Sequence, residues 1–153
     1  MWGRWNRRLG TILSVAVLAG CGGENGIVEP DPAIAPFVGT WDAEVFTVTN
    51  NASPTQVADL VESGSFDIVI EPSGLYTATL VFGIPLVEIG QLSVSGNTVT
   101  LRPNAPGETA ATSEFIFVQA DYLTLTGPTE FDFNQDGTPE AAEARIELRR
   151  RPS

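Results

Sequence analysis

Apolar and polar residues alternate along most of the chain, and this alternation predicts a series of short β-strands. In Ser65–Glu71 every second residue is apolar, and Pro72-Ser73-Gly74 then supplies a turn into a second alternating segment, Leu75–Phe82. Two such segments joined by a Pro/Gly turn are typical of a β-hairpin. Further predicted strands are Val38–Thr49, Val87–Val94, Thr98–Arg102, Ser113–Gln119, Tyr122–Thr126, Glu130–Asn134 and Ala142–Arg150.

One segment has a helical pattern. Thr55–Glu62 follows Ser53-Pro54 and ends before Gly64, which predicts a helix of about two turns. Eight or nine short strands with so little helix predict an all-β domain, because long helical patterns are needed for the mixed fold classes. An antiparallel up-and-down β-barrel is the favoured architecture, and a β-sandwich is the alternative.

The N-terminus has the pattern of a bacterial lipoprotein signal. Met1–Arg8 is basic, Leu9–Ala19 is almost wholly apolar, and Leu18-Ala19-Gly20-Cys21 resembles a lipobox. The apolar run is shorter than the roughly 20 residues that a membrane-spanning helix needs. We therefore expect residues 1–20 to be a signal peptide and Cys21, the single cysteine of the chain, to be lipidated. The expected location is the bacterial envelope. The residue after Cys21 is Gly22 and not the aspartate that retains lipoproteins at the inner membrane, which favours the outer membrane.

Residues 21–36 are rich in Gly and Pro and are predicted to form a flexible tether for the lipidated cysteine. Residues 37–153 then remain for a single β-domain, because about 117 residues support one hydrophobic core. This organisation predicts a membrane partner through the lipid anchor at Cys21.

Charge and composition exclude several classes of function. Beyond residue 20 the chain has five arginines and nineteen carboxylates, a net charge of −14, so no basic surface for nucleic acid is expected. The same segment has no histidine and no lysine, which excludes Ser-His-Asp triads and lysine Schiff bases. We expect a protein that is not an enzyme. The C-terminal run Arg149–Arg151 is expected to pair with surface acids.

Gly39-Thr40-Trp41 lies on the first predicted strand after the tether and resembles the Gly-x-Trp signature of lipocalin-like barrels. In that family the tryptophan packs at the closed end of the barrel, and an arginine from the last strand lies over its ring. The resemblance implies this role for Arg150, which shares a face with Ile146 and Leu148. Such stacking is worth about 1 kcal/mol.

An eight-stranded barrel can be filled by side chains or can hold one small ligand. The resemblance implies a small apolar ligand, and a purely structural lipoprotein is the simplest competing function. A sandwich that binds proteins and an envelope protease inhibitor also fit the pattern. The apolar residues expected to line a ligand pocket are Val45, Phe66, Ile68, Ile70, Leu80, Phe82, Phe115, Phe117, Leu123 and Leu125.

A second motif points to calcium. Residues 132–143 satisfy the D-x-[DN]-x-[DN]-G-x5-E spacing of a calcium loop, and Ca²⁺ takes six to eight oxygen ligands. Its candidate ligands are Asp132, Asn134, Asp136, Thr138, Glu140 and Glu143. The surrounding pattern is that of strands, so the loop resembles the strand-loop-strand sites of integrin-type repeats more than an EF-hand. An Asp-Gly turn with solvated carboxylates is the alternative.

Overall fold

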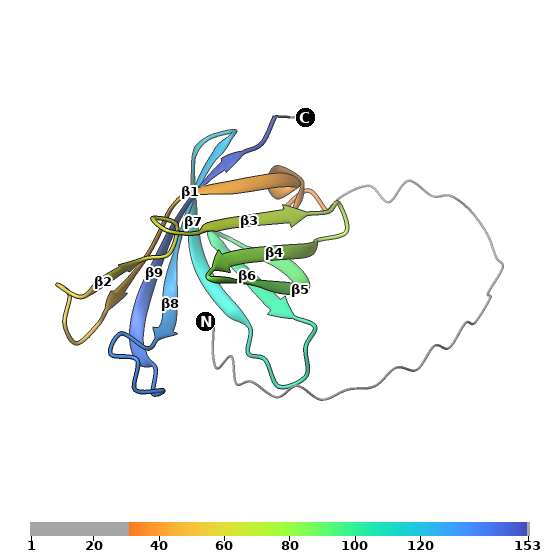
Figure 1. Cartoon of the computed structure of the whole chain (residues 1–153). Helices are drawn as coiled ribbons and strands as arrows, with labels where there is room; N and C mark the ends of the chain where they lie inside the picture. Colours follow the sequence, from red (N-terminus) through yellow and green to blue (C-terminus); the bar gives the residue numbers. More distant parts are fainter. Residues whose placement is uncertain (1–30, 153) are drawn as a thin grey trace.

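The computed structural model describes residues 31–152, which form one antiparallel sheet that curls into a barrel (Figure 1). A short 3₁₀ helix, η1, precedes nine strands. The elements are η1 (Ala35–Phe37), β1 (Gly39–Asn50), β2 (Val57–Asp59), β3 (Ser65–Ile70), β4 (Leu75–Phe82), β5 (Ile84–Ser95), β6 (Thr98–Pro103), β7 (Ala111–Gln119), β8 (Tyr122–Phe131) and β9 (Glu140–Arg150). None of these described residues forms a helix long and apolar enough to cross a bilayer.

The barrel closes through the pairing of its first and last strands. β1 pairs with β9 from Trp41 opposite Arg150 to Asn50 opposite Ala142. β3 through β9 follow one another around the sheet, and β3 also pairs with the first part of β1. β2 is an additional strand on the far half of β1. The predicted up-and-down barrel is therefore confirmed with eight strands in the ring, and the sandwich alternative is wrong because one sheet closes on itself.

A β-bulge in β1 reverses which residues point inward. The register against β9 shifts between Ala43 and Val45, leaving Glu44 as the extra residue. Beyond the bulge Phe46 and Val48 are buried, whereas Val45 is only half-buried. The prediction that Val45 faces the interior is wrong, because one inserted residue shifts the two-residue period of a strand by one position.

The predicted helix over Thr55–Glu62 is also wrong. Residues 57–59 form β2 instead, and the Asp59 carboxylate accepts hydrogen bonds from the amides of Val61 and Glu62, 3.0 and 3.1 Å away. Leu60 is buried, and its amide donates to the Phe46 carbonyl oxygen. Tertiary contacts with β1 prevail here because a helix of two turns has little stability of its own.

β8 is longer than the sequence pattern indicates. The pattern predicts two separate strands, Tyr122–Thr126 and Glu130–Asn134, on either side of Gly127-Pro128. The structure has one strand to Phe131, with Pro128 opposite Glu143. The strand continues because β9 pairs with it along its whole length.

The packed domain starts ahead of Phe37, the boundary that composition suggested. Ile34 and Phe37 are both buried, and the Phe37 ring lies 4.9 Å from Phe115 and 5.0 Å from Phe117, measured between centroids. η1 therefore plugs one end of the barrel. The predicted signal peptide, Cys21 and the predicted tether up to residue 30 lie outside the described residues.

A tyrosine is buried inside the barrel. Tyr76 is fully buried, and its hydroxyl donates to the Glu88 carboxylate over 2.6 Å. Burial, and then this hydrogen bond, raise the pKa of Tyr76 far above its usual value. Gly90 lies opposite Tyr76 in the β4–β5 ladder and leaves the space that the ring occupies.

Candidate ligand cavity

The closed end of the barrel is built around Trp41. Its side chain is 0% exposed, and the indole N–H donates to the Phe37 carbonyl oxygen over 2.7 Å. The guanidinium carbon of Arg150 lies 4.1 Å from the centroid of the Trp41 ring, as the Gly-x-Trp resemblance predicted. The ring is thus held by a hydrogen bond at its edge and by a cation on its face.

Arg150 also ties together the chain segments at this end. Its guanidinium donates to the backbone carbonyls of Val38, Pro36 and Ala120. Gly39 has φ +134°, and a Cβ there would lie 2.9 Å from Arg150 Nη1. The glycine of the signature is therefore required both by its backbone conformation and by the close approach of the arginine.

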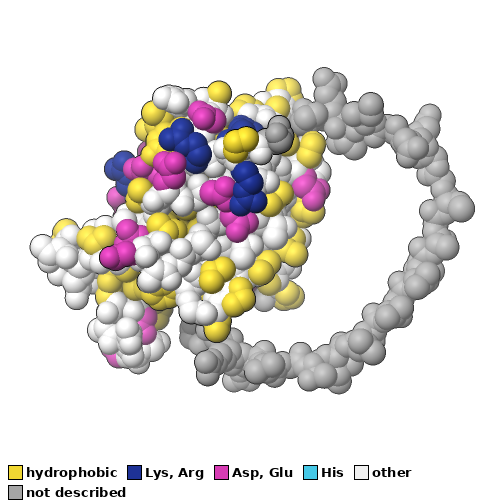
Figure 2. Space-filling view, turned by 45° about the horizontal axis from the view of Figure 1, so that its top comes forward, with side chains coloured by type: hydrophobic (Ala, Val, Ile, Leu, Met, Phe, Trp, Pro, Cys, Tyr) yellow, Lys and Arg dark blue, Asp and Glu magenta, His cyan; other side chains and the backbone are white. Residues whose placement is uncertain are grey.

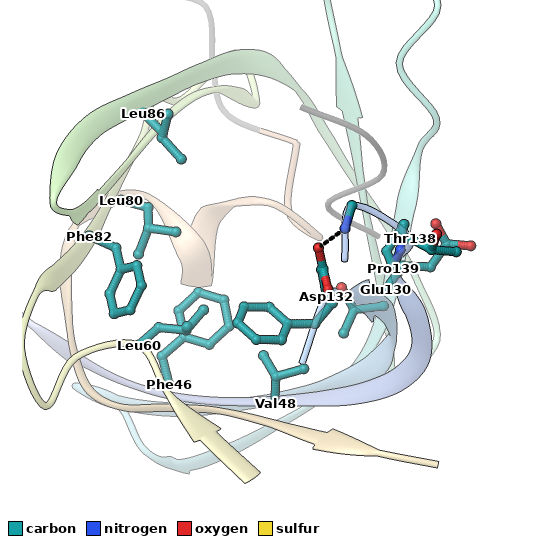
Figure 3. Close-up of a pocket in the computed structure, with 13 residues that line it drawn as sticks. Phe46, Val48, Leu60, Leu80, Phe82, Leu86, Glu130, Asp132, Thr138 and Pro139 are labelled. Atoms are coloured by element: carbon teal, nitrogen blue, oxygen red, sulfur yellow. Dashed lines mark hydrogen bonds between the residues drawn. The ribbon is translucent and has the colours of Figure 1, made fainter. Parts of the chain in front are cut away.

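The opposite end of the barrel is open and holds a cavity of about 790 Å³. Figure 3 shows Leu80, Phe82 and Leu86 facing Asp132, Thr138 and Pro139 across it, with Phe46, Val48 and Leu60 at its base. The walls come mainly from β1, β4, β5, β8 and the loop that follows β8. The remaining lining residues are Thr129, Glu130, Phe131 and Gly137. This volume is within the range of sites that hold small molecules.

The cavity uses few of the residues that the sequence pattern indicated. Leu80 and Phe82 line it. Five of the candidates are instead packed in the buried core: Phe66, Ile68, Ile70, Leu123 and Leu125. Phe115 and Phe117 surround Phe37 at the closed end. Phe46 lines the cavity and was missed because of the bulge; Leu60 was missed because its segment was predicted to be helical. Neither the bulge in β1 nor the pairing of residues 57–59 with β1 has a local sequence signal.

The charges around the cavity are negative. Glu130 and Asp132 are the charged residues that line it, and the described lining contains no arginine. The Asp132 carboxylate accepts hydrogen bonds from the amides of Asp136 and Gly137, 3.1 and 2.8 Å away. The C-terminal arginines lie at the closed end, where Arg149 pairs with Glu44 and Asp121 and Arg151 with Asp42. The charged residues among the described lining are therefore acidic.

The predicted calcium loop forms part of the cavity wall. Its polar side chains bind the loop's own backbone: the side chain of Asn134 accepts from the Asp136 amide, Asp136 from the Thr138 amide, and Glu140 from the Phe133 amide. Glu143 lies within β9, exposed on the outside of the barrel. Within residues 31–152, no three carboxylates come together in a group that could hold a metal ion.

Comparison with known proteins adds no family assignment. The sequence matches no protein-family model and no curated protein.

Proposed function

We propose that this protein binds a small, mostly apolar ligand in the open end of its barrel. The observation that carries this proposal is the cavity of about 790 Å³, walled by Phe46, Leu60, Leu80, Phe82 and Leu86. Apolar walls that are left open to solvent cost free energy, and a ligand that covers them recovers about 25 cal/mol per Å². The barrel is closed at Trp41 and open at the other end, as in lipocalin-like proteins. This arrangement supports a function in which the ligand is bound and held but not chemically changed.

The proposed location is the bacterial envelope, with the domain held at a membrane by lipidated Cys21. The support is the basic and apolar N-terminal pattern that ends in Leu18-Ala19-Gly20-Cys21. Two or more acyl chains on one cysteine give stable anchoring. We propose a binding protein and not an enzyme, because the residues that follow Cys21 contain no histidine or lysine to act as base or nucleophile.

The charge of a ligand is expected to change its affinity for the cavity. We expect decylamine to bind at least about tenfold more tightly than decanoate, with decanol between them, because the charged side chains of the described lining are the carboxylates of Glu130 and Asp132. Isothermal titration calorimetry below the micellar concentration measures all three affinities. Tighter binding of decanoate would contradict the charge argument, and no binding of any of the three would contradict the ligand proposal.

The cavity itself is tested by filling it. Leu86 is half-buried and lines the cavity, so Leu86→Trp is expected to lower decanol affinity by about tenfold or more while the fold is kept. Leu75→Trp is the matched control, because Leu75 is a half-buried leucine of the same β4–β5 ladder that does not line the cavity. Equal loss of affinity in both variants would place the ligand elsewhere.

Calcium binding by the loop at residues 132–143 stays a prediction. With a dissociation constant of about 1 mM, which is typical of extracellular sites, 10 mM Ca²⁺ stabilises the fold by about 1.4 kcal/mol. The expected result is a melting temperature several degrees higher in calcium than in chelator. The variant Asp132→Asn is expected to remove this increase. Identical melting curves in calcium and chelator would contradict the prediction.

A further inference from the structure

One side of the described barrel exterior carries no charge. Where β4 and β5 pair with each other, the outward positions are occupied by apolar residues, threonines and one glutamine: Leu75, Thr77, Thr79, Val81, Pro85, Val87, Ile89 and Gln91. Val87 and Ile89 are 56% and 49% exposed. Val81 of β4 and Val69 of the neighbouring β3 are also exposed, and we call these four residues the apolar face. Asp67 on β3 and Arg102 on β6 bound it.

The charged residues of the exterior gather elsewhere. Arg145 pairs with Glu147 on β9, and the ion pairs of Arg149 and Arg151 reach β1 and the β7–β8 turn. Figure 2 shows arginines and carboxylates interspersed over the upper part of the molecule, while hydrophobic side chains without charged neighbours gather at the lower right. The ion pairs of Arg145, Arg149 and Arg151 therefore lie on β1, on β9 and the residue after it, and on the β7–β8 turn, away from the outward positions of the β4–β5 ladder.

The apolar face continues to the mouth of the cavity. β4 and β5 are joined at Gly83, and the residues on either side, Phe82 and Ile84, are 48% and 64% exposed. Phe82 and Leu86 also line the cavity. An apolar surface thus runs from the outside of the sheet, over the hairpin tip, into the cavity.

The chain enters the domain at the β3–β4 turn, which lies at the other end of β4 from the hairpin tip at Gly83. Ile34, shortly after the first described residue, Asp31, lies against the β3–β4 turn, where its Cδ1 is 2.9 Å from the place of a Cβ on Gly74. η1 lies beside the end of β3 in Figure 1. Nine residues separate Cys21 from Asp31 and reach at most about 30 Å. A lipid on Cys21 can therefore reach a bilayer that lies along the β3–β5 side of the barrel.

We infer that the apolar face rests on the bilayer surface, with the β4–β5 hairpin tip inserted among the lipid headgroups. This orientation rests on the proposed lipidation of Cys21. It places the cavity mouth at the membrane, so that an apolar ligand passes between bilayer and barrel along Phe82 without crossing water. An exposed apolar patch with an adjacent tether is better covered by lipid than by water.

The test uses the lipidated full-length protein in phosphatidylcholine vesicles, with one environment-sensitive fluorophore on an introduced cysteine. Thr79→Cys places the label on the apolar side, and Thr124→Cys is the matched control, since both are half-buried threonines on the barrel exterior. We expect blue-shifted emission and quenching by spin-labelled lipid for the label at 79, at least about threefold stronger than for the label at 124.

Flotation with the vesicles tests the lipid anchor separately from the orientation of the barrel. A protein that floats, with both labels equally unquenched, overturns the orientation and leaves the anchor in place. A protein that does not float overturns the anchor and the orientation together. A blue shift at 79 that depends on protein concentration and persists without lipid assigns the apolar face to a second copy of the chain and overturns the inference.

Discussion

Trp41→Ala is expected to lower the free energy of unfolding by about 3–5 kcal/mol, the usual cost of removing a large aromatic side chain from a core. The indole is fully buried, donates to the Phe37 carbonyl and supports the Arg150 guanidinium. Its loss leaves a cavity at the closed end and removes the support for η1. Denaturant unfolding followed by far-UV circular dichroism measures the change without the tryptophan signal.

Trp41→Phe separates packing from the polar contacts. The ring volume is partly kept while the N–H that binds the Phe37 carbonyl is lost, so a smaller loss of about 1–3 kcal/mol is expected. Trp41 does not line the cavity, so ligand affinity of the folded Phe variant is expected to remain close to that of the parent. A Trp41→Ala variant as stable as the parent would show that the closed end is not organised by this residue.

Gly90→Ala is the second large effect, with an expected loss of about 3 kcal/mol. Replacing a strand glycine by alanine ordinarily stabilises a protein by about 0.4–1 kcal/mol, because the unfolded chain loses conformational freedom. Here a Cβ would overlap the Arg102 carbonyl oxygen and lie 2.6 Å from the Tyr76 hydroxyl. A loss of stability is therefore expected if Gly90 is packed as the structure shows, and a gain is expected if it is an ordinary strand position.

Gly83→Ala provides the control for this experiment. A Cβ at Gly83 meets no described atom within 4 Å, and only its φ of +79° opposes the substitution. The expected loss is about 1 kcal/mol, from backbone strain alone. Thermal or urea unfolding of both variants gives the comparison, and a Gly90→Ala variant more stable than the parent would contradict the packing around Tyr76.

Local patterns predicted the parts of this fold that depend on local interactions. The alternating segments at residues 65–71 and 75–82 predicted β3 and β4 closely. The contact between Trp41 and Arg150, more than a hundred residues apart, was implied by the resemblance to the Gly-x-Trp signature, and the structure has it. The alternation of strands is visible in sequence because one face of each strand must be buried.

The errors arose where a distant strand overrode the local pattern. Residues 57–59 pair with β1 in place of a helix, and β8 runs on past Pro128 because β9 pairs with it. Because of the bulge at Glu44, Phe46 and not Val45 points into the barrel. Each change depends on the position of another strand, and a short window of sequence does not contain that position.

The alternation of apolar and polar residues is enough to predict an all-β fold, because it is encoded by residue type and spacing. The contact between Trp41 and Arg150 was implied by the resemblance to the Gly-x-Trp signature. The folded chain was needed to choose the predicted barrel over the sandwich, and to show that the end at Trp41 is packed while the other end holds a cavity. A cavity is the volume that side chains from several strands fail to fill. Its place therefore depends on register and packing, which only the folded chain brings together.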